Sequence, residues 1–105
     1  MEYRSVYITF PDPEEARRIG QALVESRLVA CVNIFDGIDS IYWWEGKIEN
    51  AREVALIAKT RESLCDKLIE KVKQLHSYEV PCVCTWPIRE VLDDYAAWIE
   101  EETRA

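Results

Sequence analysis

Two tryptophans, Trp43 and Trp44, stand next to each other in the stretch "IYWWEGKIEN". The residues on both sides continue an extended pattern, so we expect the pair to lie on a β-strand. Successive side chains of a strand point to opposite faces of the sheet, and two neighbouring indoles therefore cannot share one core. One of the two rings needs a second surface to bury it.

The composition is that of one small folded domain, which we expect to span residues 1–105. Hydrophobic residues make up 49% and charged residues 31% of the chain, a balance typical of a globular protein without a disordered tail. A domain of this length buries only about two thirds of the surface that its unfolded chain exposes. Four Trp and five Tyr are many for so modest a core, which favours association with a partner, most simply a second copy.

The charge of the chain argues against two classes of partner. The formal net charge is −7, whereas nucleic-acid backbones and anionic membranes are bound by clusters of Lys and Arg. No stretch approaches the roughly twenty apolar residues of a membrane span, and Met1 leads directly into a strand-like segment without a signal-peptide core. We therefore expect a cytoplasmic protein that binds neither nucleic acid nor membrane.

The four cysteines do not form the paired CxxC spacing of a zinc ribbon or a thioredoxin motif. Cys82 and Cys84 are two residues apart in an apolar run, so on a strand they would point in the same direction. We expect free, buried thiols at Cys31, Cys65, Cys82 and Cys84. A soft-metal site at Cys82 and Cys84 is the alternative.

The N-terminal pattern predicts a strand followed by a helix. Residues 3–10 alternate between apolar and more polar positions, as a half-buried strand does. Asp12 is a suitable N-cap, Pro13 takes the first helical position, and Glu15 completes an Asp version of the capping box. An apolar stripe at helical spacing then predicts a helix that continues to about Ser26.

The middle of the chain predicts two long extended segments. The first begins at Leu28, and the second runs over residues 47–59. Both Asp36-Gly37 and Glu45-Gly46 are turn candidates, and the former is the stronger by dipeptide preference. Because residues 38–44 continue as strand, Asp36-Gly37 is either a hairpin turn or a bulge in one very long strand, and the sequence leaves both open.

The C-terminal part predicts a helix, a short strand and a second helix. Thr60 is the expected cap of a helix that ends near His76. Residues 80–86 form a short apolar strand that begins beside a proline and so lies at a sheet edge. Asp93 and Asp94 suit the first turn of the last helix, where acidic side chains favour the positive end of the helix dipole.

The expected order is β-α-β-β-α-β with an extra C-terminal helix, an α+β arrangement called ferredoxin-like. Right-handed crossovers would place the two main helices on one face of a four-stranded sheet. The other face would stay open and carry many aromatic side chains. We expect another copy of the chain to cover one Trp of the pair together with Tyr3, Tyr7, Asn33 and Phe35.

Five segments in this order resemble the divalent-cation tolerance (CutA) proteins, and together they cover nearly the whole chain. They are "TFPDPEEA", "LVACVNI", "SIYWWEGKIE", "LIAKT" and "HSYEVP". The resemblance implies a small cytoplasmic, ferredoxin-like protein that forms a tight homotrimer and is similar in architecture to the PII signalling proteins. It also implies a link to tolerance of copper and other divalent metals, with copper binding and without a defined enzymatic reaction.

The resemblance also implies which residues meet in the trimer. A long hairpin between the second and third strands reaches neighbouring subunits, with Tyr42, Trp43 and Trp44 in or near the contact. This agrees with the argument from strand alternation. We expect no cofactor to be required for folding.

The predicted metal residues are His76, Glu79 and Cys82. The family motif usually reads His-Pro-Tyr followed by an acidic or amide residue, and its histidine corresponds to His76, with Ser77 where proline is usual. Cys82 stands where many members carry Glu, which would favour softer metals such as Cu(I). A lone histidine at a helix end is also a common capping residue for the last carbonyls.

Three other functions remain as alternatives. A PII-like trimer would bind a small anion in a cleft between subunits, with Asn33, Lys47, Lys59, Arg61 and Tyr78 as candidates. A Cys31 and His76 pair is the only combination for nucleophilic catalysis, and no charged neighbour in the sequence would activate that thiol. RNA binding on exposed aromatics is opposed by the acidic charge.

Overall fold

The structure is a computed structural model that describes residues 1–104. Its elements follow in the predicted order, and their bounds are β1 Tyr3–Phe10, α1 Pro13–Glu25, β2 Cys31–Trp44, β3 Lys47–Arg61, a 3₁₀ turn Glu62–Leu64, α2 Cys65–Leu75, β4 Val83–Ile88 and α3 Asp93–Glu102. The α+β class is confirmed. Within residues 1–104 no helix has both the length and the apolar composition needed to cross a membrane.

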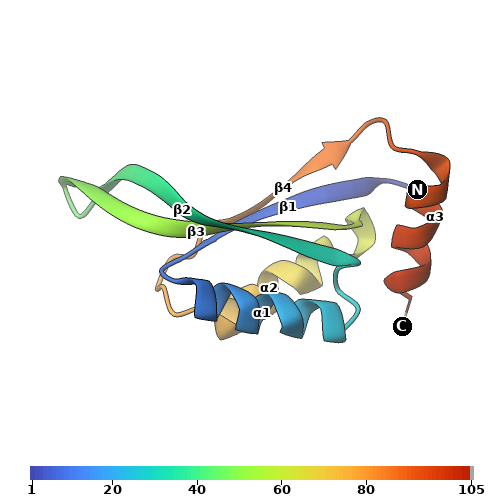
Figure 1. Ribbon diagram of the computed structural model, residues 1–105, viewed down its shortest axis with the longest axis horizontal. Helices are drawn as coiled ribbons and strands as arrows, with labels where there is room; N and C mark the ends of the chain where they lie inside the picture. The colour runs from blue at the N-terminus through green and yellow to red at the C-terminus, as the bar shows by residue number, and fades with distance from the viewer. Residues whose placement is uncertain (105) are drawn as a thin grey trace.

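The strands form one antiparallel sheet in the order β2-β3-β1-β4. Helices α1 and α2 cover one face of this sheet, and α3 lies at the end where the N-terminus is found (Figure 1). The hairpin of β2 and β3 extends beyond the helices at the opposite end (Figure 1), so the molecule measures 44 × 25 × 22 Å. The helix-bearing face is called the covered face below, and the other the open face.

The core lies between the covered face and the two helices. Alternate residues of β1 point into it, and Val6, Ile8 and Phe10 are fully buried. The apolar stripe of α1 packs against these side chains, as predicted, and its buried residues recur at helical spacing. The remaining core consists of Ala16, Ile19, Leu23, Val29, Val54, Leu56, Ala58, Leu68 and Val72.

Helix α1 begins as predicted, but half of the expected capping box is replaced by a long-range contact. Asp12 Oδ1 accepts a hydrogen bond from the backbone N–H of Glu15 at 2.8 Å. The Glu15 carboxylate accepts instead from the N–H of Ser77 at 3.1 Å and from its hydroxyl at 2.9 Å. The capping box is therefore corrected to a single cap, because the carboxylate joins α1 to the chain after α2.

The long second strand contains a bulge, which settles the choice at Asp36-Gly37. The pairing of β2 with β3 shifts between Asp36 and Ile38, and Gly37 has a φ of 81°, which favours glycine. The hairpin turns at Glu45 and Gly46, both with positive φ as in a type I′ turn. The predicted long hairpin is confirmed, although β2 begins at Cys31 rather than at Leu28.

Two predicted boundaries near β3 and β4 are wrong. Thr60 does not cap a helix, because it belongs to β3 and its hydroxyl donates to the carbonyl of Leu28 at 2.7 Å. Helix α2 starts later, at Cys65, after the 3₁₀ turn. The last strand starts at Val83 instead of Val80 and continues to Ile88 as the edge strand beside β1.

The open face is only partly covered, and the cover at one end comes from α3. The Tyr95 hydroxyl lies 3.5 Å from Cys31 Sγ, Tyr3 donates to the Glu100 carboxylate, and Arg61 Nε donates to Thr103 Oγ1 at 2.9 Å. Farther toward the hairpin, Phe35 is 50% exposed, as the sequence predicts. On edge strand β4, Trp86 is 43% exposed, which was not predicted from the sequence.

All four cysteines are free, but only one matches the expectation of buried thiols. Cys65 is buried and Cys31 is half-buried, whereas Cys82 and Cys84 are exposed. Tyr7 pairs with Cys84 in the sheet, so this thiol lies on the open face. Burial is therefore the wrong interpretation for Cys82 and Cys84. Cys84 lies on the open face of edge strand β4, and Cys82 lies in the connection just before that strand.

Candidate functional site

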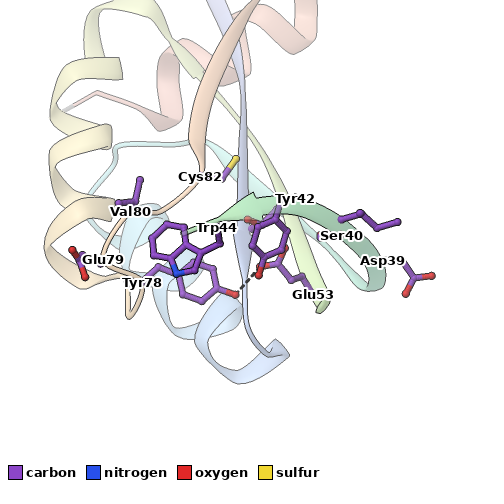
Figure 2. A pocket seen from close by; sticks show the side chains of 11 residues that line it. Asp39, Ser40, Tyr42, Trp44, Glu53, Tyr78, Glu79, Val80 and Cys82 are labelled. Atoms are coloured by element: carbon purple, nitrogen blue, oxygen red, sulfur yellow. Dashed lines mark hydrogen bonds between the residues drawn. The ribbon is translucent and has the colours of Figure 1, made fainter. Parts of the chain in front are cut away.

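A cavity of about 700 Å³ lies at the base of the hairpin, on the side of the open face. Strands β2 and β3 form one wall, and the connection from α2 to β4 forms the other (Figure 2). The lining residues are Thr9, Asp39, Ser40, Ile41, Tyr42, Trp44, Glu53, Tyr78, Glu79, Val80 and Cys82. Its volume is in the range of small-molecule sites, roughly 300–1,000 Å³.

A tyrosine and a glutamate connect the two walls. The Tyr78 hydroxyl donates to Glu53 Oε2 at 2.6 Å (Figure 2). Burial, and next the hydrogen bond to this carboxylate, raise the pKa of Tyr78 above its usual range. Glu53 is only 7% exposed, and the bond holds its carboxylate at the cavity. Tyr78 is therefore a neutral donor at physiological pH.

The bulge decides which tryptophan faces the cavity. Before Gly37, odd-numbered residues of β2 lie on the open face. After it even-numbered residues do, since Ile38 pairs with Glu53 and Trp44 with Lys47. Trp44 lies beside Tyr78 in the cavity (Figure 2). Trp43 points to the other side and is 72% exposed. The two indoles do occupy opposite faces, as strand alternation predicts.

Aromatic and apolar side chains at the hairpin tip remain uncovered on both faces. Trp43 pairs with Ile48, which is 59% exposed, and Ile41 is 72% exposed. On the cavity side, Tyr42 and Trp44 are 41% and 42% exposed. An exposed apolar ribbon of this kind marks a contact surface in soluble proteins. The three predicted interface residues therefore all belong to exposed surface in the single chain.

His76 is buried beneath the cavity, and both of its ring nitrogens have partners. Nε2 lies 2.7 Å from the carbonyl oxygen of Thr9, and Nδ1 accepts from the N–H of Tyr78 at 3.0 Å. Because Nδ1 accepts from this N–H, Nε2 is the ring nitrogen that donates to the Thr9 carbonyl. The ring also stacks on Phe10 at 4.9 Å between centroids. His76 is the C-cap residue of α2, but its side chain ties the helix end to β1 instead of bonding the last carbonyls.

The predicted metal residues do not fit a metal ion within one chain. Glu79 and Cys82 line the cavity, while His76 lies below it and would have to give up Thr9 or Tyr78 to ligate. Among residues 1–104 no group of three His, Cys, Asp or Glu side chains is placed to hold a metal ion. Metal binding by these residues stays a prediction, which requires donors from more than one chain.

The residues expected to bind an anion are spread along the sheet. Of the five, only Tyr78 lines the cavity, and Arg61 donates to Thr103 at the α3 end. Asn33 and Lys59 lie toward the α3 end of the sheet, and Lys47 lies at the hairpin tip. The cavity is lined by carboxylates and by no Lys or Arg, so it does not favour an anion.

Cys31 and His76 lie in different parts of the fold. The thiol of Cys31 is beside Tyr95 of α3, and this contact raises the pKa of Tyr95 to about 12. The imidazole of His76 bonds the carbonyl of Thr9 on the far side of the sheet. The pair is therefore not an activated nucleophile.

Sequence reasoning missed Glu53 and Glu15, the two buried carboxylates of this region. Glu53 lies on the open face of β3 together with Ala55 and Ile57. An acidic residue that continues an apolar alternation is the signal that could have identified it. Glu15 was assigned to a local cap, and nothing in the sequence indicates its partner Ser77.

Comparisons with known proteins agree over almost the full length. The family model described as CutA1 divalent ion tolerance protein matches residues 4–102. The divalent-cation tolerance protein CutA of Archaeoglobus fulgidus is 50% identical over 96 residues, which are 91% of this chain and 93% of the relative. That of Pyrococcus horikoshii is 46% identical over 99 residues, 94% and 96% of the two chains. The crystal structure of CutA1 from Oryza sativa aligns with a TM-score of 0.96 at 44% identity, covering 99% of this chain and 95% of that one. The chain belongs to the CutA1 divalent ion tolerance family.

Proposed function

We propose that this protein is a non-enzymatic, cytoplasmic homotrimer that contributes to divalent-cation tolerance by binding copper. The observation that carries the proposal is family membership over residues 4–102. The separation of Cys31 from His76 supports a role without catalysis, because a nucleophile needs a base within hydrogen-bond reach.

Self-association is supported by the hairpin tip. Trp43 and Ile48 form a cross-strand pair that no other part of residues 1–104 buries. Burying one such side chain contributes about 2 kcal/mol, so three hairpins packed on neighbouring chains would stabilise the assembly strongly. The trimeric state follows the family resemblance.

Copper binding is proposed at donors shared between chains. Cys82 and Glu79 are exposed and lie at the same cavity, and a thiolate favours Cu(I) over harder cations. His76 acts in this proposal as a structural link rather than as a ligand, because its two ring nitrogens are already bonded.

Calorimetry with Cu(I), Cu(II) and Zn(II) on the assembled protein tests the metal site. We expect Cys82→Ser and Glu79→Gln to weaken Cu(I) binding about tenfold or more, since each removes a donor. Glu90→Gln is the control, because Glu90 lies outside the cavity. Unchanged affinity in both donor variants would refute the site, and a loss confined to His76→Ala would return the ligand role to that residue.

Growth in medium with raised copper tests the cellular role. A strain that lacks the gene should regain tolerance when it expresses the wild-type chain and should not regain it with Cys82→Ser. Native mass spectrometry with and without copper should report the mass of three chains in both cases. A monomer at micromolar concentration would contradict the proposed assembly.

A further inference from the structure

The cavity at the hairpin base combines negative charge with aromatic walls. Asp39, Glu53 and Glu79 line it, and the lining contains no Lys or Arg. The nearest cation in contact with these carboxylates is Arg52, whose Nη1 lies 3.6 Å from Asp39 in a strongly exposed pair. Such exposed pairs contribute little, typically below about 1 kcal/mol. The cavity therefore favours a cationic ligand.

Glu53 is the group in this cavity that most needs a cation. Only 7% of the Glu53 surface is exposed. Its Oε2 accepts one hydrogen bond, from the Tyr78 hydroxyl. Within residues 1–104 no Lys, Arg or His nitrogen lies within 4.0 Å of its carboxylate. Buried carboxylates are normally paired with a positive charge. Among the described residues, Glu53 has a hydrogen-bond donor but no cationic partner.

The walls indicate the kind of cation. Rings of Tyr42, Trp44 and Tyr78 surround the position next to Glu53 (Figure 2). Ring faces attract weakly hydrated organic cations, whereas inorganic divalent ions require several oxygen, nitrogen or sulfur ligands at short distance. Among residues 1–104 no three potential metal ligands come together. Three aromatic rings beside one buried carboxylate match an alkylammonium group better than a metal ion.

We propose that this cavity binds a small organic cation of the alkylammonium class. Its positive nitrogen lies at Glu53, and its alkyl groups contact the rings of Trp44, Tyr42 and Tyr78. The site goes beyond the proposed role in metal tolerance, because its contacts are Glu53 and three aromatic rings, whereas the proposed copper donors Glu79 and Cys82 lie elsewhere on the lining of the same cavity. Tyr78 has a further part here, since its hydrogen bond orients the Glu53 carboxylate.

Binding is tested with (2-hydroxyethyl)trimethylammonium as the probe and its neutral carbon analogue, 3,3-dimethylbutan-1-ol, as the matched control. The full-length protein in its native assembly is titrated by calorimetry, and tryptophan fluorescence is recorded in parallel. We expect saturable binding of the ammonium compound and at least about tenfold weaker binding of the alcohol, because only the former carries the charge.

Two variants with matched controls locate the site. Glu53→Gln keeps the size of the side chain and an acceptor for Tyr78 but removes the negative charge. We expect it to lower the affinity for the probe about tenfold or more. Glu25→Gln is the matched control and should leave the affinity for the probe unchanged, because Glu25 lies outside the cavity. Trp44→Leu should weaken binding and remove most of the fluorescence change. Trp86→Leu should preserve both, although Trp86 is as exposed as Trp44, 43% against 42%.

Each outcome decides the proposal. Absence of saturable binding to the wild type would overturn it. Equal affinity for the neutral alcohol, or an unchanged affinity in Glu53→Gln, would also overturn it. Loss of Cu(I) binding in Cys82→Ser with intact probe binding would leave the two sites separate, as proposed.

Discussion

At the scale of single residues, buried polar groups of this protein are partnered across long sequence distances. His76 bonds Thr9 and Tyr78, and Glu15 bonds Ser77. These contacts fix the chain between α2 and β4 against β1 and α1, and this chain segment is one wall of the cavity. The position of Tyr78 therefore depends on residues that do not touch a ligand.

Removing the Glu15 carboxylate should destabilise the fold. Glu15→Ala leaves the Ser77 N–H and hydroxyl without their acceptor, which we expect to lower the free energy of unfolding by about 1–3 kcal/mol. Glu14→Ala is the matched control, because Glu14 is the exposed neighbour in the same helical turn. Urea unfolding of both variants measures the difference, and equal midpoints would contradict the structural role of Glu15.

Tyr78 should make stability depend on alkaline pH. Its pKa is raised above the ordinary value of 10.0 by burial and by Glu53, so the folded state holds this proton more tightly than the unfolded state. The resulting stabilisation is complete below pH 10 and is lost as the pH rises above it. Tyr78→Phe should flatten this loss, measured by urea unfolding at pH about 8 and about 10.5. An equally steep loss in the variant would assign the effect to other tyrosines.

At the scale of secondary-structure elements, the β2 and β3 hairpin sets the positions of both the cavity and the exposed tip. Its geometry depends on two glycines with positive φ, Gly37 in the bulge and Gly46 in the turn. A side chain at Gly46 would meet nothing within 4 Å, whereas a Cβ at Gly37 would come within 2.8 Å of Arg52 Nη2. The two positions therefore differ in crowding but share the same backbone requirement.

Alanine at either glycine should destabilise the hairpin. Gly46→Ala is expected to cost about 1 kcal/mol from its left-handed backbone alone. Gly37→Ala should cost at least as much and should also displace Arg52 from Asp39. Gly46→Asn is the control, since asparagine tolerates this conformation. Thermal unfolding checks the order, and a Gly46→Ala protein as stable as the wild type would refute the argument from φ.

Local patterns predicted the elements whose partners lie nearby in sequence. Helix α1 was predictable because its cap and apolar stripe are both local. Thr60 was assigned to a helix cap because its own neighbourhood permits one, but its hydroxyl bonds Leu28 from a distant strand. The cavity was not predictable for the same reason, since Glu53 and Tyr78 meet only after the sheet has formed. The aromatic contact surface was predicted because alternation is a property of the strand itself.

At the scale of the whole molecule, the assembly and the cavity depend on opposite faces of one ribbon. The tip carries Trp43 and Ile48 on one face and Tyr42 and Trp44 on the other. A single chain buries neither set, so the stable unit should be larger than one chain. The proposed cation site is then a property of the assembly as well, because the same ribbon must be held in place.

A charge at the tip should dissociate the assembly. Trp43→Glu places a carboxylate in the proposed contact, and burying it without a partner costs several kcal/mol. We expect native mass spectrometry to show monomers of this variant at micromolar concentration. Leu92→Glu is the control, because Leu92 has the same exposure of 72% but lies far from the hairpin. An intact trimer of Trp43→Glu would exclude this face from the contact.

The bulge at Gly37 has a consequence for how the hairpin tolerates change. Because side chains alternate with a period of two, gaining or losing one residue between the bulge and the turn would exchange Trp43 and Trp44 between their two environments. Point replacements leave this parity intact. The hairpin should therefore tolerate substitutions far more readily than insertions or deletions. Selection should remove one-residue insertions and deletions between residues 38 and 43, although many substitutions there persist.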